Sequence, residues 1–343
     1  MFVISPSESP PAGRGPGLVL GVWDFISSPY SATPLLQRHS IALCTPDADM
    51  DLSSQILQYV ISGITNGAIY AVIALGFTII YNSTEVINFA QGEFVMLGGM
   101  AVIALDGMSH LPLGFSFLLA VLAVTLVGIA LERFTIRPAK SSDPIALIII
   151  TVGASIFLRG VAMMFWGKDS LGLRPFTGST PIHLGGATLA PQSLWVLGVT
   201  VVVMAGLQFF YKRTITGKAM RACAFNRRAA GLVGIGVNRM VLVSFALSAA
   251  IGAAAGVVVV PITLCGYDVG IMLGLKGFCA AVLGGLGSSP GSILGGFLLG
   301  VLEALGAGLI SSGFKDAIAF FVLLLVLFIR PSGLVGSKEV KRF

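Results

Sequence analysis

The stretch "QILQYVISGITNGAIYAVIALGFTIIY", residues 55–81, contains no charged residue and is longer than one membrane crossing requires. A spanning helix needs about 20 apolar residues, because each residue advances about 1.5 Å through roughly 30 Å of hydrocarbon. Further apolar runs follow, and we expect helices at 55–81, 92–106, 113–131, 144–166, 191–211, 240–264, 290–312 and 316–330. The sequence predicts an all-α polytopic membrane protein with about eight transmembrane helices.

The composition supports the same fold class. Hydrophobic residues make up 55% of the 343 residues, charged residues make up 10%, and the mean hydropathy is +0.94. Soluble domains average about 45–50% apolar and about 25% charged residues. The 44 glycines suit helices that pack closely in lipid, where small residues let two backbones approach.

The basic residues indicate the orientation. The loop 212–239 holds seven Lys or Arg residues and no acid, which marks it as cytoplasmic, and Lys338, Lys341 and Arg342 place the C-terminus on the same side. An odd number of crossings must therefore follow the outer loop near Asp268. The segment "GFCAAVLGGLG", residues 277–287, is too short to cross alone and is typical of a discontinuous or re-entrant pass that supplies the missing crossing.

Three regions differ in character. Residues 1–49 are rich in Pro, Ser and Gly, and we expect either a disordered extension or a start upstream of the natural one at Met50. Residues 50–336 are expected to form one transmembrane domain, and residues 337–343 a cytoplasmic tail. The N-terminal stretch lacks the basic region and apolar core of a signal peptide.

The motifs of two enzyme classes are absent. Gly217-Lys218 is followed by Ala219 and lacks the upstream glycine of a P-loop, and H-E-x-x-H does not occur. The cysteines at 44, 223, 265 and 279 form no C-x-x-C pair and no zinc spacing. We expect no catalytic residue, no metal site and no cofactor, and therefore a protein that is not an enzyme.

Polar residues near apolar runs are the candidates for a transport pathway. The stretch "STEVINFAQGEFVMLGG", residues 83–99, carries Glu85, Asn88, Gln91 and Glu93, which either line a water-accessible pathway or form a turn that caps the next helix. Glu303 lies midway along an apolar run, where a bare charge costs about 2.5–3.5 kcal/mol, so we expect a partner on another helix or a contact with substrate.

Two further features belong to the candidate pathway. Gly284 and Gly285 mark a possible broken helix, whose bare carbonyl groups and helix ends commonly form transporter sites, although tight packing is compatible with the same glycines. Arg159 lies toward the outer end of its helix, where we expect its side chain to extend to the membrane surface.

The basic loop contains "TGKAMRACAFNRRAAGLVGIGVNR", residues 216–239. A short helix with a small-residue face can enter a groove on a partner protein, and the glycines at 231, 234 and 236 would end that helix. The alternative is a loop that only sets membrane orientation.

Several blocks resemble one family in collinear order over about residues 54–336. They are "NGAIYAVIALGFTIIY", "VINFAQGEFVMLGG", "IRPAKSSDPIALIIITVGASIFLRG", "RACAFNRRAAGLVGIGVNR", "AAVLGGLGSSPGSILGGFLLGVLEALGAG" and "LFIRPSGLVG". They resemble the permease subunit of branched-chain amino-acid ABC importers of the LivH type. Many relatives read "NFAHGE" where this chain has Gln91 in "NFAQGE".

The resemblance implies a multi-pass subunit of the bacterial inner membrane, with a cytoplasmic C-terminus. It implies partnership with a second, related permease, two ATP-binding cassette subunits that bind ATP, and a periplasmic or extracellular substrate-binding protein; membrane lipid surrounds the subunit and no nucleic acid is involved. Ala229, Ala230 and Gly234 match the A-A-x-x-x-G core of the ATPase-coupling loop, although Arg228 stands where the general pattern has Glu. The implied coupling residues are Arg221, Ala222, Arg227, Arg228, Ala229, Ala230 and Gly234.

The expected function is import of branched-chain or other hydrophobic amino acids. Two alternatives remain open at the level of sequence. One is a permease for urea or short amides built on the same pattern. The other is an ATP-independent channel or ion-coupled carrier, in which the charges of Glu303 and Arg159 would be the working parts.

Overall fold

The computed structural model describes residues 52–109, 112–139, 143–178, 180–184, 186–330 and 332–336. The expectations for residues 1–49 and 337–343 lie outside these ranges. Within them the chain is almost entirely helical, and seven of the described helices are long and apolar enough to span a membrane.

The helices lie close to their predicted positions. They are α1 (Leu52–Thr84), α2 (Gln91–Ser109), α3 (Leu113–Leu131), α4 (Pro144–Trp166), α5 (Pro191–Arg213), α6 (Ile215–Phe225), α7 (Arg227–Leu232), α8 (Val237–Val259), α9 (Val269–Gly284), α10 (Ser289–Leu309) and α11 (Lys315–Ile329). A π-helical turn, η1 (Glu132–Ile136), continues α3, and a 3-10 turn, η2 (Ser312–Phe314), precedes α11. The strands β1 (Ile182–Leu184) and β2 (Ala187–Leu189) form an antiparallel hairpin. All eight predicted helices are confirmed.

The prediction around 277–287 was wrong in its bounds. A helix, α9, already begins at Val269, and only residues 285–288 form the turn into α10. The charge of Lys276 interrupts the apolar pattern, which conceals the first half of this helix in the sequence. α9, α10 and α11 supply three helices after Asp268, which is the odd number that the charge pattern requires.

α1 is the centre of the bundle, and it packs against α10 through glycine. Gly67 and Gly300 lie back to back, and a Cβ atom on either glycine would collide with the other helix's backbone. Such close approach lets backbone and side-chain atoms of the two helices make extensive van der Waals contact, which is the main source of helix association in lipid.

α2 and α9 both begin deep inside the bundle. The Gln91 amide at the start of α2 donates to the carbonyl oxygen of Ser248, which lies about 16 Å along α8. The backbones of Gly92 and Gly270 are in contact, so α9 begins beside α2. Residues 85–90, which lead into α2, form a bend and a turn and are not helical.

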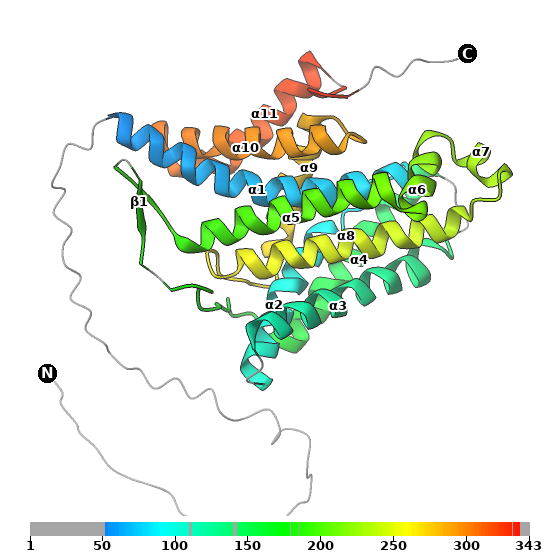
Figure 1. Cartoon of the computed structure of the whole chain (residues 1–343), viewed down its shortest axis with the longest axis horizontal. Helices are drawn as coiled ribbons and strands as arrows, with labels where there is room; N and C mark the ends of the chain where they lie inside the picture. The colour runs from blue at the N-terminus through cyan, green and yellow to red at the C-terminus, as the bar shows by residue number, and fades with distance from the viewer. Residues whose placement is uncertain are drawn as a thin grey trace, which may run out of the picture. The chain divides into compact units, whose positions relative to one another are not determined.

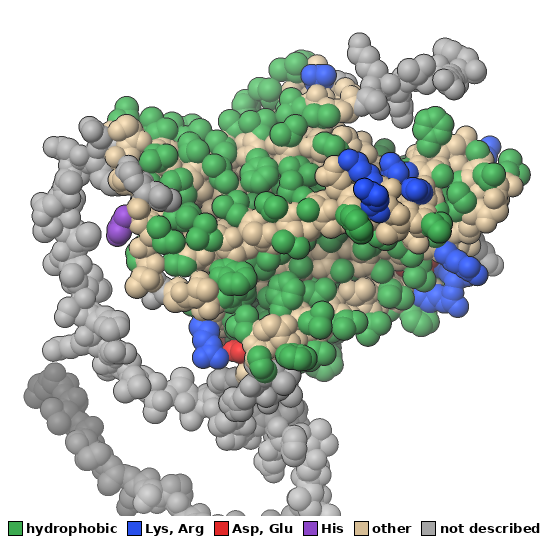
Figure 2. Space-filling model, in the orientation of Figure 1, with side chains coloured by type: hydrophobic (Ala, Val, Ile, Leu, Met, Phe, Trp, Pro, Cys, Tyr) green, Lys and Arg blue, Asp and Glu red, His purple; other side chains and the backbone are tan. Residues whose placement is uncertain are grey.

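The bundle has two chemically different ends (Figure 1). At one end, which we call the hairpin end, Gln58 of α1 bonds to Thr188 of β2. At the other, which we call the basic end, α1 and α5 finish and α6 and α7 lie. Figure 2 shows Lys and Arg side chains gathered at the basic end, while apolar side chains cover much of the face between the two ends. That distribution suits a protein with its sides in lipid.

Candidate functional site

The loop expected to couple to an ATPase folds into two short helices. Thr214 caps α6 by accepting a bond from the Gly217 amide at 2.9 Å, and Asn226 caps α7 by accepting one from the Ala229 amide at 3.0 Å. Because Asn226 takes an extended conformation, it separates the two helices, and the expectation of one short helix was wrong. Gly234, with a φ of 87°, turns the chain toward α8.

The coupling residues differ in exposure. Arg221, Ala222, Arg228, Ala229 and Gly234 are exposed, but Ala230 is only 3% exposed and packs inward. Arg227 is half-buried, and its Nη1 atom donates to the carbonyl oxygen of Thr84 at 3.3 Å. A hydrogen bond therefore joins α7 to the end of α1.

Apolar side chains at the tip of this region were missed by sequence reasoning. Phe225 and Leu232 are each 91% exposed, and Val233 is also exposed. The signal was available in the sequence, because these residues interrupt a basic and alanine-rich segment. An exposed apolar tip flanked by arginines is typical of a surface that binds another protein.

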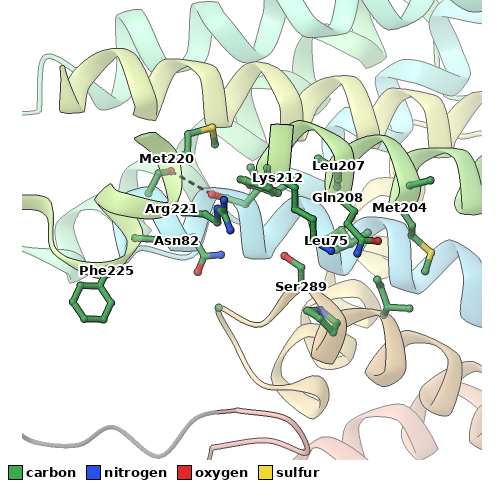
Figure 3. Close-up of a pocket in the computed structure, with 18 of the residues that line it drawn as sticks. Leu75, Asn82, Met204, Leu207, Gln208, Lys212, Met220, Arg221, Phe225 and Ser289 are labelled. Carbon is green, nitrogen blue, oxygen red and sulfur yellow. Dashed lines mark hydrogen bonds between the residues drawn. The ribbon is translucent and has the colours of Figure 1, made fainter. Parts of the chain in front are cut away.

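A groove of about 920 Å³ opens beside this region, between α1, α5, α6 and α10 (Figure 3). Its walls are mostly apolar and include Leu75, Ile79, Met204, Leu207 and Ile293. Figure 3 also shows polar side chains around it, namely Asn82, Gln208, Lys212, Arg221 and Ser289, with Phe225 apart at the rim. No residue expected to line the pathway borders this groove among those described.

Gln91 is fully buried and joins three helices. The Ser248 hydroxyl of α8 lies within hydrogen-bond distance of two acceptors, Gln91 Oε1 and the carbonyl oxygen of Gly76 on α1, the second at 2.9 Å. This amide holds the start of α2 in place. Asn88 stabilises the turn before α2, because its Oδ1 atom accepts a bond from the Ala90 amide at 3.1 Å.

Glu93 joins α2 to α4. Its Oε1 atom accepts a bond from the Ser155 hydroxyl at 2.8 Å and lies 3.3 Å from the Arg159 Nε atom. The expectation that Arg159 extends to the membrane surface was wrong, because the buried carboxylate attracts the guanidinium inward.

Glu303 joins α10 to three other helices. Its Oε1 atom lies 3.1 Å from the Tyr70 hydroxyl, 3.0 Å from Lys276 Nζ and 3.4 Å from Lys315 Nζ. Lys276 also lies 2.6 Å from Asp316. The expected partner on another helix is confirmed. Sequence reasoning missed Lys276, although a lysine inside an apolar run is itself a signal of a buried partner.

Gly284 and Gly285 lie at the turn after α9. Gly285 has a φ of 105°, and the amide groups of Leu334 and Val335 donate to the carbonyl oxygens of Leu283 and Gly284 at 2.9 and 3.0 Å. The absence of side chains at these glycines lets residues 332–336 pack closely against the backbone at the end of α9. Of the expected lining residues, only Glu85 and Asn88 border a common pocket, which lies at the basic end.

Comparison with known proteins places the chain in a family. A sequence model described as "branched-chain amino acid transport system / permease component" matches residues 59–327. The permease protein BraD of Pseudomonas aeruginosa, from a high-affinity branched-chain amino acid transport system, is 34% identical over 299 residues, which cover 83% of this chain and 97% of BraD. The corresponding LivH protein of Salmonella typhimurium is 35% identical over 301 residues, with the same coverage.

More distant relatives also match. The ribose import permease protein RbsC of Escherichia coli is 24% identical over 276 residues, which cover 76% of this chain and 82% of RbsC. Among solved structures, PsaBC from Streptococcus pneumoniae in complex with Fab has a TM-score of 0.41 and 16% identity, and the match covers 83% of this chain and 94% of that one. The family match and the relatives above 30% identity establish that this chain belongs to the permease-component family of branched-chain amino acid transport systems, a family of multi-pass ABC importer subunits.

Proposed function

We propose that this chain is the transmembrane permease subunit of an ABC importer for branched-chain or other hydrophobic amino acids. The observation that carries the proposal is the exposed α6–α7 region with the Ala229, Ala230 and Gly234 pattern, in a chain whose relatives BraD and LivH are named for branched-chain amino acid transport. The subunit itself would make and break no bond, because ATP would be bound and hydrolysed by partner subunits.

The basic end would face the cytoplasm of a bacterium, with the protein in the inner membrane. Short basic loops remain on the cytoplasmic side of a membrane, and Lys212, Arg213, Arg221 and Arg228 all lie at this end. Residues 334 and 335 bond to the C-terminal end of α9, which supports a cytoplasmic C-terminus.

The α6–α7 region would receive the ATPase. Exposed Phe225 and Leu232 would enter an apolar groove on one of two ATP-binding cassette subunits, and the small side chains of Ala222 and Ala229 would allow close approach. Movement of that subunit would pass to α1 through the Arg227 bond to Thr84 and to α5 through Thr214. Alternating access would follow from rocking of helices about the glycine contacts between α1 and α10.

The groove between α1, α5 and α10 would form this subunit's wall of the substrate route, and a second, related permease would complete it. The apolar walls suit aliphatic side chains better than urea, which favours amino acids over the urea alternative. A periplasmic or extracellular binding protein would deliver substrate at the hairpin end. Gln91, Glu93, Glu303, Gly284 and Gly285 would hold helices in place, since each is enclosed by packing or polar contacts.

The carrier alternative depends on free charges in the membrane. Glu303 and Arg159 are each held in an ion pair with another helix, which favours a structural role for both. A matched pair of experiments separates the two functions. The chain is purified from native membranes in mild detergent, the copurifying proteins are identified by mass spectrometry, and leucine uptake is measured in proteoliposomes with and without ATP.

We expect a second permease and P-loop ATPases to copurify, and uptake to require ATP and the binding protein. Uptake by the chain alone, without ATP, would contradict the proposal and support the carrier.

A further inference from the structure

A second cavity, of about 380 Å³, lies inside the basic end of the bundle, and we call it the basic-end pocket. It is enclosed by the end of α1, the turn before α2, η1 and the starts of α4 and α8, and Arg227 of α7 also lines it. Its volume falls within the range of about 300–1,000 Å³ that is usual for small-molecule sites.

Two buried polar atoms in this pocket have no hydrogen-bond partner among the described residues. They are Nδ2 of Asn88 and Oε2 of Glu132, and the two residues are 1% and 2% exposed. Glu93 and Glu303 each keep one unpaired oxygen as well, but both have cation partners, whereas Glu132 has no ion pair with a described residue. An unpaired buried polar atom costs about 1–3 kcal/mol, so a donor and an acceptor without partners on two residues that line the same pocket point to a ligand.

The charges of the pocket have both signs. Arg137 and Arg227 supply cations, while Glu85 and Glu132 supply carboxylates. Apolar side chains complete the wall, including Ile80, Leu147 and Phe245. The large groove, in contrast, is bordered by Lys212 and Arg221 without any acid among the described residues. Of these two cavities of the described residues, the basic-end pocket alone presents groups for both the ammonium and the carboxylate of a zwitterion.

The backbone around the pocket is unusual at two points. Glu85 is the one described residue other than glycine with a positive φ, at 58°. Glu132 begins the π-helical turn η1, and such turns frequently occur at functional sites. Both distortions place a carboxylate at the pocket.

We propose that the basic-end pocket binds a free zwitterionic amino acid with an aliphatic side chain. The carboxylate lies against Arg137 and Arg227, the ammonium lies near Glu132 and Glu85, and the aliphatic group lies against the apolar wall. The choice of an aliphatic amino acid, and of the cytoplasm as its source, rests on the proposed import function. Because Arg227 also fastens α7 to α1, occupancy changes the segment that would receive the ATPase, and accumulated product thereby slows its own import.

The test measures binding of radiolabelled leucine to the purified full-length chain in detergent, without the binding protein. We expect saturable binding that excess isoleucine or valine displaces. Neither 4-methylpentanoate, which lacks the ammonium, nor 3-methylbutylamine, which lacks the carboxylate, should displace it. No saturable leucine binding to the wild-type chain overturns the inference.

Matched variants locate the site. Arg137→Gln and Glu132→Gln should each weaken leucine binding by about tenfold or more, as expected for loss of one charge-assisted hydrogen bond. Arg133→Gln is the control, because Arg133 lies on the same π-helical turn, is exposed and does not line the pocket; its affinity should stay within about twofold of wild type. Equal affinity of all three variants overturns the inference. Glu132→Gln is isosteric and provides the test if Arg137→Gln does not insert.

A second readout separates this inference from the proposed function. In the reconstituted complex, leucine on the α6–α7 side should inhibit ATPase activity of the wild type and of Arg133→Gln, and should inhibit Glu132→Gln only at about tenfold higher concentration. ATP-driven leucine import without such inhibition overturns the feedback role and leaves the import function intact. Saturable leucine binding without ATP-driven import contradicts the import function instead.

Discussion

Charged residues inside this protein occur in two settings, and the difference separates structure from function. In the α9–α10–α11 cluster, Glu303 Oε1 lies within 3.4 Å of two lysines and Tyr70, and Lys276 is shared with Asp316. In the basic-end pocket, the lining residues Asn88 and Glu132 each keep a buried polar atom that has no partner among the described residues. A paired charge in the interior joins helices, whereas an unpaired charge beside a cavity is available to a ligand.

The largest expected effect on stability comes from breaking the ion pairs of the α9–α10–α11 cluster. Lys276→Met leaves Glu303 without its nearest cation, and breaking a buried ion pair typically costs about 3–5 kcal/mol. We expect a strong loss of thermal stability in detergent, measured by fluorescence-detected size-exclusion chromatography after heating. The double variant Lys276→Met with Glu303→Leu should recover much of the loss, because both buried charges are removed and the remaining Asp316 and Lys315 are accessible to solvent. A double variant as unstable as the single one would contradict the pairing role.

The next effect concerns the exposed half of the basic end. Ala229→Glu places a bulky charge on the surface proposed to receive the ATPase, so ATP-driven uptake should be abolished while the amount of inserted chain stays unchanged. Ala230 is unsuitable for this test, since it is buried and a large side chain there would disturb packing. Ala229→Ser is the control and should retain uptake. Normal uptake by Ala229→Glu would remove the coupling assignment.

A smaller effect is expected when a charge is removed from the open pocket. Glu132→Gln should change the free energy of unfolding by less than about 1 kcal/mol, because no ion pair with a described residue is lost. The same heating assay measures it beside Lys276→Met. A loss of stability as large as that of Lys276→Met would show that Glu132 has a structural role. The distinction between the paired charges around Glu303 and the unpaired charge of Glu132 would then be wrong.

The smallest effect concerns reactivity rather than stability. Burial raises the pKa of the Cys223 thiol on α6, and nearby Arg227 opposes this only in part. The thiolate is the reactive form, so a raised pKa lowers its fraction at neutral pH, and maleimide labelling should be slow and accelerate as pH rises. An exposed cysteine in Ala222→Cys should label quickly, and bound ATPase should protect it. Rapid labelling of native Cys223 would contradict the inward packing of α6.

Most helices could be predicted because apolar length alone determines a membrane crossing. α9 was only partly predictable, since Lys276 is acceptable in an apolar helix once Glu303 and Asp316 neutralise it, and those residues lie far away in the sequence. The helical segment is interrupted at Asn226 because this side chain caps α7. Asparagine is a common N-cap residue, so the sequence contained this signal, but the nearby glycines drew attention to a helix end further along the chain.

The sites were harder to predict than the helices. The polar residues 85–93 looked like one group in the sequence, yet their side chains lie in three places. Glu85 and Asn88 line the basic-end pocket, Gln91 bonds to Ser248, and Glu93 pairs with Arg159. The pocket itself combines Glu85, Glu132, Arg137 and Arg227 from three separate regions. No local pattern can reveal such a site, because only the packing of α1, α3, α4 and α8 brings its members together.

The central claim is that the α6–α7 region transmits the action of an ATPase. The most direct measurement places a photo-crosslinking amino acid at position 229, with position 201 in the middle of α5 as a matched exposed control, in the complex purified from native membranes. The account predicts an adduct with a P-loop ATPase from position 229 and none from position 201. Active, ATP-driven import with no ATPase adduct from position 229 would contradict it.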